Sequence, residues 1–369
     1  MTGSAPVGAL AQILEMARWA PSGDNTQPWR FEVVSAHHLV VHGFDTRDYC
    51  VYDLDGRASQ MSLGALVETV AIAATAHGLR VDCRWRSDSP DDRPTFDLKF
   101  TADGGLQRDP LHDFIEQRSV QRKPYATAPL TADEKAALET SVSGTGHRML
   151  WLESRRERFA MARLLFRSAR LRLVTPEAYI VHRDVIEWNA RHSVDRIPDQ
   201  ALGVNQMMLS TMRFVMHSWE RVQFFNRFLA GTWMPRIQMD FVPALACGAH
   251  FLILSPIQPD GLTAHVAAGR ALQRFWLTAT RLGLMLQPEL TPLIFARYAQ
   301  ENRPFSVHRE ASSSARAVST EWMQIVGADA ASRGVFLGRI GRAQAPLSRS
   351  LRHDVANLQH VADRTSDRT

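Results

Sequence analysis

Two stretches of this chain that lie 205 residues apart match each other, and this internal match constrains the fold more than any other feature of the sequence. One helix is predicted over residues 57–77 and a second over residues 267–283, and each ends at a glycine. At that constant offset five identities fall within sixteen positions: Gly64 with Gly269, Ala74 with Ala279, Thr75 with Thr280, Gly78 with Gly283, and Leu79 with Leu284. A repeat of this kind predicts two related halves, residues 1–100 and 105–369. The alternative is a chance match between two apolar helices.

Hydrophobic periodicity around these helices predicts a mixed α/β chain. The first half is expected to contain a helix (10–20), two strands (31–34 and 39–44), the helix ending at Gly78, and a further strand (79–85). Residues 87–109, rich in Pro, Asp and Gly, are expected to form an exposed connection. The second half is expected to begin with a short helix (111–117), a helix opened by a capping box of Thr131 and Glu134, a strand (149–152) and an arginine-rich helix (155–173).

Residues 189–243 are predicted to be an insertion that the first half lacks. They are rich in methionine and large aromatic residues, which suit a lid over a planar ligand because both present adaptable apolar faces. The alternative is an ordinary core or a pair of helices that binds a partner.

Composition excludes several classes of protein. The charge of +5 would attract any phosphate-bearing molecule, so it gives no specific reason to expect a nucleic-acid partner. Seven arginines on the predicted helix over residues 155–173 are expected to form a solvated face. Three cysteines without a CxxC pair argue against a disulfide framework or a cysteine zinc site, and the irregularly placed His182, His192 and His217 indicate no metal. No membrane span or leader is predicted, so a cytoplasmic location is expected.

The residues between the first helix and the first strand are the most specific motif of the chain. Ala20 to Trp29 read A-P-S-G-D-N-T-Q-P-W, which resembles the A-P-S-x-x-N-x-Q-P-W loop of the nitroreductase family. A polar loop with hydroxyl, amide and free backbone groups can hold the ribityl chain and ring edge of a flavin. The resemblance implies an α+β sandwich that binds flavin mononucleotide (FMN). The loop residues expected to bind it are Pro21, Ser22, Gly23, Asn25 and Gln27.

A second motif lies in the other half. The residues Arg118-Ser119-Val120-Gln121-Arg122 are similar to the phosphate motif of the same family, which more often reads R-R-S-x-R. Arginine forks and a serine hydroxyl are suitable partners for a phosphate monoester. This chain departs from the pattern, because Gln117 and Gln121 replace two basic residues and Arg122 is displaced by one position. Arg118, Ser119 and Arg122 are nevertheless the residues expected to hold the phosphate.

Later segments also resemble the family. Gln287, Pro288 and Glu289 match the strand and loop that pass the reactive edge of the flavin, and Arg349 with Arg352 resembles a C-terminal basic pair that reaches the phosphate. The first half thus supplies the Ala20–Trp29 loop, and the second half supplies the phosphate motif, the reactive-edge segment and the basic pair. This order is expected if a nitroreductase dimer has become a single chain, as in a tandem mycobacterial subgroup of the family that Asp53-Leu54-Asp55-Gly56-Arg57 also resembles.

The function that the resemblance implies is transfer of hydride from NAD(P)H, through FMN, to a nitro compound, quinone or similar small-molecule acceptor. The flavin would carry the chemistry, so no catalytic side chain is predicted. Two alternatives stay open: a protein that holds flavin without turnover, and a specialised enzyme of molybdopterin or flavin metabolism. The chain is expected to be a monomeric pseudo-dimer or a homodimer, with neither nucleic acid nor a membrane as partner.

Overall fold

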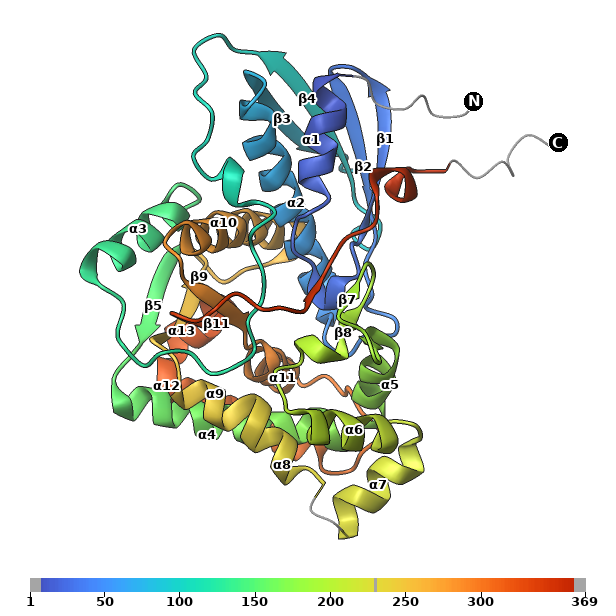
Figure 1. Cartoon of the computed structure of the whole chain (residues 1–369), viewed down its shortest axis with the longest axis vertical. Helices are drawn as coiled ribbons and strands as arrows, with labels where there is room; N and C mark the ends of the chain where they lie inside the picture. Colours follow the sequence, from blue (N-terminus) through green and yellow to red (C-terminus); the bar gives the residue numbers. More distant parts are fainter. Residues whose placement is uncertain (1–7, 229–230, 362–369) are drawn as a thin grey trace, which may run out of the picture.

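The computed structural model describes residues 8–228 and 231–361, and it has an α+β fold with two antiparallel four-stranded sheets (Figure 1). The first sheet has the order β1-β2-β4-β3 and consists of β1 (Trp29–Ser35), β2 (His38–Gly43), β3 (Leu79–Trp85) and β4 (Thr95–Ala102). The second has the order β10-β11-β9-β5 and consists of β5 (Arg148–Leu152), β9 (Ala249–Leu254), β10 (Met285–Pro288) and β11 (Gly334–Gly341). Each sheet packs one face on its own apolar cluster.

The two sheets are built in the same way. Each begins after a helix, α1 (Ala9–Ala17) or α3 (Ala132–Ser143), and each has a long helix between its second and third strands, α2 (Arg57–Thr75) or α10 (Gly261–Arg281). In chain order, the strands of both sheets lie side by side as first, second, fourth and third. A duplication of one unit predicts this repeated topology.

Helices α2 and α10 cross between the sheets at their glycines (Figure 1). A Cβ atom at Gly64 would lie 2.8 Å from the carbonyl carbon of Val266 and still closer to its oxygen, and one at Gly269 would lie 2.7 Å from the carbonyl carbon of Met61. Met61 and Val266 are separated by 205 positions, as the two glycines are. The backbones of the two helices therefore touch, and the contact of Gly64 with Val266 is equivalent to that of Gly269 with Met61. Such paired equivalent contacts are typical of an interface with two-fold symmetry.

Polar contacts farther along these helices follow the same rule. Arg274 Nη1 donates to Glu68 Oε1 over 2.9 Å, and Gln273 Nε2 donates to Thr69 Oγ1 over 2.9 Å. Adding 205 to Glu68 gives Gln273, and subtracting it from Arg274 gives Thr69, so the two contacts are equivalents of each other. Nearly all of α2 is buried, so this interface is part of the core.

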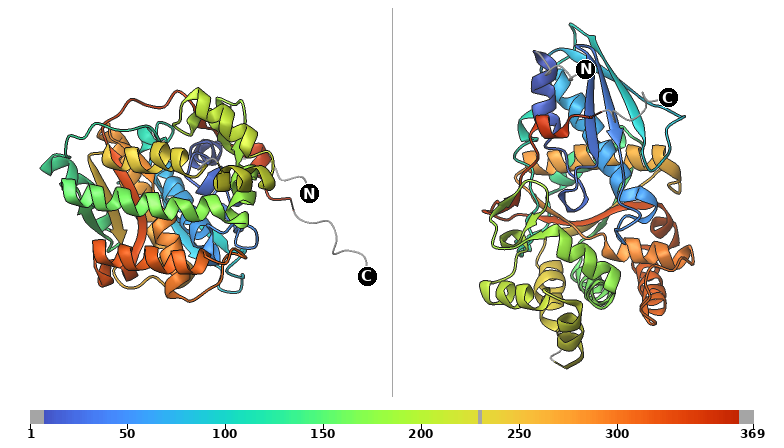
Figure 2. Two further views of the ribbon diagram at one scale, coloured as in Figure 1. Left: turned by 90° about the horizontal axis from the view of Figure 1, so that it is seen from below. Right: turned by 90° about the vertical axis from the view of Figure 1, so that its right-hand side faces the viewer.

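The second sheet carries two sets of additional elements. Between β5 and β9 lie α4 (Arg155–Val174), α5 (Pro176–Val185), β6 (Ile186–Glu187), β7 (His192–Ser193), β8 (Ile197–Pro198), α6 (Gln206–Val215), α7 (Trp219–Phe228), α8 (Trp233–Arg236), a π-helical turn (Ile237–Phe241) and α9 (Val242–Leu245). Between β10 and β11 lie α11 (Thr291–Gln300), α12 (Ala311–Val326) and α13 (Ala328–Arg333). Most of these helices gather at the end of the molecule opposite the first sheet (Figure 2). The extra segment is thus longer than the predicted 189–243, of which residues 229–230 lie outside the described chain.

Two local predictions were wrong. The expected connection over residues 87–109 contains β4, an inner strand whose alternating Phe96, Leu98 and Phe100 are buried in the core. Its flanking Pro, Asp and Gly residues obscured this period of two. The expected helix over residues 111–117 is only a 3-10 turn, His112–Phe114. Among the described residues, no helix is both long and apolar enough to cross a membrane.

The C-terminal segment returns from the second sheet to the first. Its strand β12 (Arg349–Ser350) pairs in parallel with β7, and Gln359 then forms a bridge with Phe31 of β1 (Figure 1). The peptide N–H of His360 donates to the carbonyl of Phe31 over 2.8 Å. This segment therefore joins the inserted elements to the edge of the first sheet.

Asp53 fixes the turn that leads into α2. Its buried carboxylate accepts five hydrogen bonds of 2.6–3.1 Å from the backbone and hydroxyl groups of Thr46 and Ser59 and from the backbone of Ala58. We expect Asp53→Asn to lower the free energy of unfolding by about 2 kcal/mol, because an amide N–H₂ would face donors. Urea titration checks this against Asp88→Asn at an exposed position. Equal stabilities would contradict the assigned role.

Candidate functional site

The Ala20–Trp29 loop is held in an unusual backbone conformation. Asp24, Asn25 and Gln27 have φ angles of 48°, 65° and 48°, a region that residues other than glycine rarely adopt. The hydroxyl of Ser22 accepts the N–H of Gln27 over 3.0 Å and closes the loop on itself. Residues kept in sparsely populated conformations cluster at functional sites, where the surrounding structure holds them.

The amides of Asn25 and Gln27 connect this loop to the inserted segment and to the C-terminal segment. Asn25 Nδ2 donates to the carbonyl of Arg196 over 3.3 Å, and Gln27 Nε2 donates to that of Val194 over 2.8 Å. Gln27 Oε1 accepts the N–H of His353 over 2.9 Å. Gln27 is fully buried. Of the side-chain amide atoms of Asn25 and Gln27, only the buried Oδ1 of Asn25 has no hydrogen-bond partner within the described chain. The two side-chain amides that are predicted to bind flavin thus also hold the inserted segment and the C-terminal segment against the loop.

Three of the predicted phosphate-binding arginines meet just before this loop. Arg118 Nη2 donates to the carbonyl of Trp19 over 3.0 Å, and Arg352 Nε donates to that of Ala20 over 3.0 Å. The guanidinium of Arg349 lies over the Trp19 ring, 4.9 Å from its centroid. Arg118 is distant in the sequence from Arg349 and Arg352, yet the three arginines form one group, called here the arginine cluster.

The arginine cluster has an uncompensated positive charge. Burial lowers the pKa of Arg118 well below its usual range, and the charges of Arg352 and Arg349 lower it further. Burial, followed by the charges of Arg349 and Arg18, lowers the pKa of Arg352 to about 9. Within the described chain none of the three forms a salt bridge, and the Nε groups of Arg118 and Arg349 lack an acceptor. Arg118 and Arg352 are buried, whereas Arg349 is half-buried and the charge of Glu116 acts on it. Guanidinium groups that lack a salt-bridge partner in this way fit a phosphate dianion.

Ser119 and Arg122 are not placed equally. Ser119 follows Arg118 directly and is half-buried, at the point where the backbone bridges from Val120 to Leu286 of β10. Arg122 instead donates from Nη1 to the carbonyl of Ala201 over 3.1 Å, and burial lowers its pKa while the charge of Asp24 raises it. Arg122 thus lies between the loop and the inserted segment, outside the arginine cluster.

The predicted reactive-edge residues are joined by buried ionic contacts. Arg339 of β11, which is fully buried, donates from Nη2 to Gln287 Oε1 over 2.6 Å and to the carbonyl of Arg122 over 2.8 Å. Glu289 Oε2 lies 2.7 Å from His250 Nδ1, and Arg339 Nε lies 3.8 Å from Glu289 Oε1. Pro288 is half-buried between Gln287 and Glu289 at the end of β10. The side chains of Gln287 and Glu289 therefore hold the end of β10 against Arg339 of β11 and His250 of β9.

His250 is charged in this arrangement. Its Nδ1 faces the Glu289 carboxylate and its Nε2 faces the carbonyl of Ala244 over 2.9 Å, so both ring nitrogens must donate. Burial is the largest single effect and lowers the pKa of His250, but the charge of Glu289, the contribution of Cys247 and the hydrogen bonds to both residues together raise it to about 10. A fully buried imidazolium thus stands next to Glu289.

The structure adds residues that the sequence patterns did not single out. Trp19 stacks with Arg18 and Arg349, and Trp276 of α10 lies 4.7 Å from the guanidinium of Arg118. Trp19 immediately precedes the recognised loop, so a wider motif would have included it. His250 interrupts the apolar run of β9, which is the one signal that could have found it.

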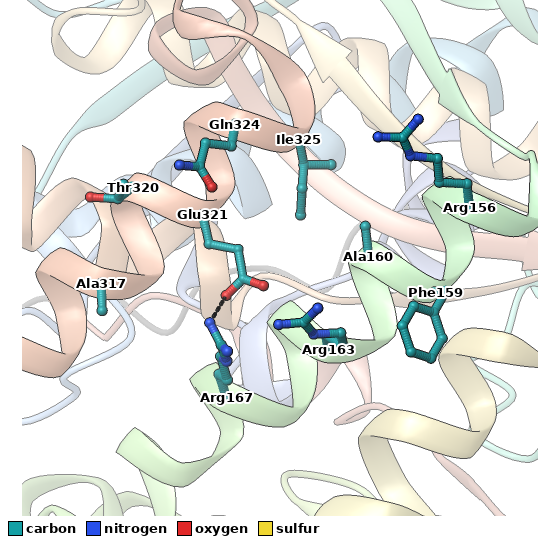
Figure 3. Close-up of a pocket in the computed structure, with 10 residues that line it drawn as sticks. All are labelled: Arg156, Phe159, Ala160, Arg163, Arg167, Ala317, Thr320, Glu321, Gln324 and Ile325. Atoms are coloured by element: carbon teal, nitrogen blue, oxygen red, sulfur yellow. Dashed lines mark hydrogen bonds and ion pairs between the residues drawn. The ribbon is translucent and has the colours of Figure 1, made fainter.

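The arginine-rich helix α4 borders a separate groove. The groove, of about 580 Å³, lies between α4 and α12 and is lined by Arg156, Arg163, Arg167, Glu321 and Gln324 among others (Figure 3). Arg167 Nη1 pairs with Glu321 over 2.8 Å, and Arg172 on the same helix pairs with Asp240. The predicted solvated face of this helix is therefore partly engaged in ion pairs. None of the predicted cofactor-binding residues lines this groove.

Comparison with known proteins agrees with the loop motif. Residues 5–55, which contain the Ala20–Trp29 loop, match the model of the nitroreductase family. A Mycobacterium tuberculosis (strain CDC 1551 / Oshkosh) protein described as uncharacterized protein MT1398 is 25% identical over 295 residues, which are 77% of this chain and 39% of that protein. The chain thus spans well under half the length of this curated relative. No group of three or more metal-binding side chains occurs in the described part of the chain. Over residues 5–55 the chain is therefore similar to the nitroreductase family, as the loop predicts.

Proposed function

We propose that this protein is an FMN-dependent oxidoreductase that passes hydride from NAD(P)H to a nitro compound, a quinone or a similar acceptor. The arginine cluster carries the proposal: the buried guanidinium groups of Arg118 and Arg352 and the half-buried one of Arg349, none of which forms a salt bridge in the described chain, lie beside the family's flavin loop. The family match supports a flavin-dependent oxidoreductase, and the topology shared by the two sheets supports a site assembled from two halves of a duplicated unit.

The residues fit an FMN molecule in distinct roles. The charges of Arg118, Arg349 and Arg352 would neutralise the phosphate, and the Ser119 hydroxyl would donate a hydrogen bond to it. The unpartnered Nε groups of Arg118 and Arg349 would supply further donors for its oxygens. The Ser22–Gln27 loop would hold the ribityl chain and ring edge, and Pro288 with Glu289 would lie at the reactive edge. The bound flavin would supply two-electron hydride chemistry. The chain's own contribution is to bind, orient and shield it.

Replacing Arg118 by methionine separates binding from folding. We expect Arg118→Met to weaken FMN binding at least tenfold, because a charge-assisted contact to phosphate is lost. The same change should raise the stability of the cofactor-free protein by about 1–2 kcal/mol, because it removes a buried charge that has no carboxylate partner in the described chain.

FMN titration by fluorescence quenching and urea unfolding of the cofactor-free protein measure the two effects. Arg84→Met, at an exposed arginine of β3, serves as the control and should change neither. Failure of the unaltered protein to bind FMN would refute the proposed function. Equal FMN affinity in the Arg118 variant would refute the assigned phosphate site.

A second candidate function is flavin storage without turnover. It is favoured by the bonds from Asn25 and Gln27 to the inserted segment and by the C-terminal segment that covers the same loop. Anaerobic addition of NADH or NADPH to the FMN-bound protein distinguishes the two. Loss of the visible flavin absorbance supports the reductase, and an unchanged spectrum supports storage.

A further inference from the structure

Four polar side chains from the first half and the inserted elements form a cluster that the FMN site does not use. Arg172 Nη2 of α4 donates to both carboxylate oxygens of Asp240, over 2.7 and 2.6 Å. The Tyr52 hydroxyl lies 3.1 Å from Nε2 of His182 on α5. The charge of Arg172 lowers the pKa of His182 in addition to burial, and the charges of Arg172 and Asp240 both act on Tyr52. The two pairs are therefore neighbours.

This cluster adjoins the predicted reactive edge. Asp240 lies on the π-helical turn Ile237–Phe241, and the carbonyls that follow it, of Pro243 and Ala244, accept hydrogen bonds from Arg339 and His250. The same Arg339 and His250 contact Gln287 and Glu289. On the other side, the charge of the loop residue Asp24 acts on Tyr52. The cluster thus lies between the flavin loop and the end of β10.

The environment of Asp240 suits an acid that exchanges protons near neutral pH. Burial raises the pKa of Asp240 to about 6, against the opposing charge of Arg172, while Glu289 raises it and Arg236 lowers it. About 12% of its side-chain surface stays accessible. π-Helical turns inside helical segments occur frequently at functional sites.

We propose that Asp240 is the acid that protonates the acceptor, an oxygen-bearing compound such as a quinone, while Tyr52 and His182 line the same side of the site. The inference rests on the proposed function, which supplies the reduced flavin as hydride donor. The acceptor gains one hydride from that donor, and its oxygen forms a new O–H bond as the O–H bond of Asp240 breaks. The product is the two-electron-reduced acceptor, and the aspartate that remains is neutralised by Arg172 until water returns the proton.

The test follows oxidation of the FMN-bound, dithionite-reduced protein by stopped flow. With a quinone, Asp240→Asn should slow oxidation about 100-fold, the usual contribution of a positioned acid. With ferricyanide, which accepts single electrons without a proton, the rate should stay unchanged. In the unaltered protein the quinone rate should fall as pH rises through about 6. Glu321→Gln, which breaks the Arg167–Glu321 ion pair outside the site (Figure 3), is the control and should leave all rates unchanged.

A second measurement needs no turnover. In cofactor-free protein, the urea midpoint of the unaltered chain should fall relative to that of Asp240→Asn as pH rises from about 4 to 7, because the fold then bears a buried carboxylate. If that variant does not fold, Arg172→Gln takes its place and should shift the fall of the quinone rate to higher pH. Absence of FMN binding would refute the proposed function itself. Normal FMN binding with equal quinone rates in the Asp240 variant, or an unshifted profile in the Arg172 variant, would overturn this inference alone.

Discussion

Gly64→Ala is expected to lower the free energy of unfolding by about 4 kcal/mol, more than most single substitutions do. A Cβ at this position would meet the backbone of Val266 on α10, which cannot rotate away as a side chain can. The two helices must therefore separate, and the polar contacts of Glu68 and Thr69 farther along the crossing would be stretched as well. Urea or thermal unfolding, monitored by circular dichroism, measures the effect.

Gly269→Ala should cost about as much, because its Cβ would meet the backbone of Met61 in the equivalent way. Gly144→Ala is the matched control: a Cβ there meets no atom within 4 Å and the residue already has helical angles. We expect the control to change stability by less than about 1 kcal/mol. If the Gly64 and Gly269 variants lose strongly unequal amounts of unfolding free energy, the two helices do not make equivalent contacts where they cross.

His250 is expected to make stability strongly dependent on alkaline pH. The folded-state pKa of His250 is raised to about 10, above the unfolded value of 6.5, so its contribution is complete below pH 6.5 and is lost as pH rises toward 10. The loss should be on the order of 4 kcal/mol, since one pKa unit corresponds to about 1.4 kcal/mol. His250→Gln keeps a donor for Glu289 without a titrating ring, so its stability should lack this dependence.

The measurement is the difference in unfolding free energy between the two proteins at several pH values from 6 to 10.5. The unaltered protein should be the more stable one near neutral pH, and the gap should narrow at the alkaline end. Other titrating groups affect both proteins alike, so the difference isolates His250. A gap that is constant with pH would mean that the buried ring is neutral beside Glu289.

Much of the secondary structure follows from the sequence because it depends on local patterns. The apolar periodicity of α2, the terminal Gly78 and the capping box at Thr131 are each fixed by residues a few positions apart. Strand β4 was missed because its five-residue alternation from Phe96 to Phe100 lies between stretches typical of loops. Its inner position depends on partners in β2 and β3 that no local pattern reveals.

The sequence motifs name the arginines of the candidate site, but they do not indicate which neighbours tertiary packing gives to each side chain. Arg118, Arg349 and Arg352 were singled out because their segments resemble the family's phosphate motif and C-terminal basic pair, and the fold brings them together at Trp19 and Ala20. Arg122 was grouped with them as the displaced last arginine of the same motif, and its side chain donates to the carbonyl of Ala201. This contact depends on the path of the inserted segment, which the spacing of residues in the sequence does not predict.

The buried ionic contacts were beyond sequence reasoning for the same reason. His250 and Glu289 are 39 positions apart, and they meet only because β11 lies between β9 and β10 in the sheet. Gln27 likewise reads as a polar loop residue, although the structure buries it completely under Val194 and His353. Both cases require knowledge of which strands and loops become neighbours.

The crossing of α2 with α10 has a consequence for synthesis of the chain. Helix α2 is buried on almost all sides, yet the helix that covers it ends 206 residues later, at Arg281. At ribosomal rates of about 5–20 residues per second, its apolar surface waits roughly 10–40 seconds for that partner. During this interval α1 and the first sheet can pack against α2, but the face of α2 that α10 later covers stays exposed. We therefore expect the ribosome-bound intermediate to depend on chaperones far more than the finished molecule does.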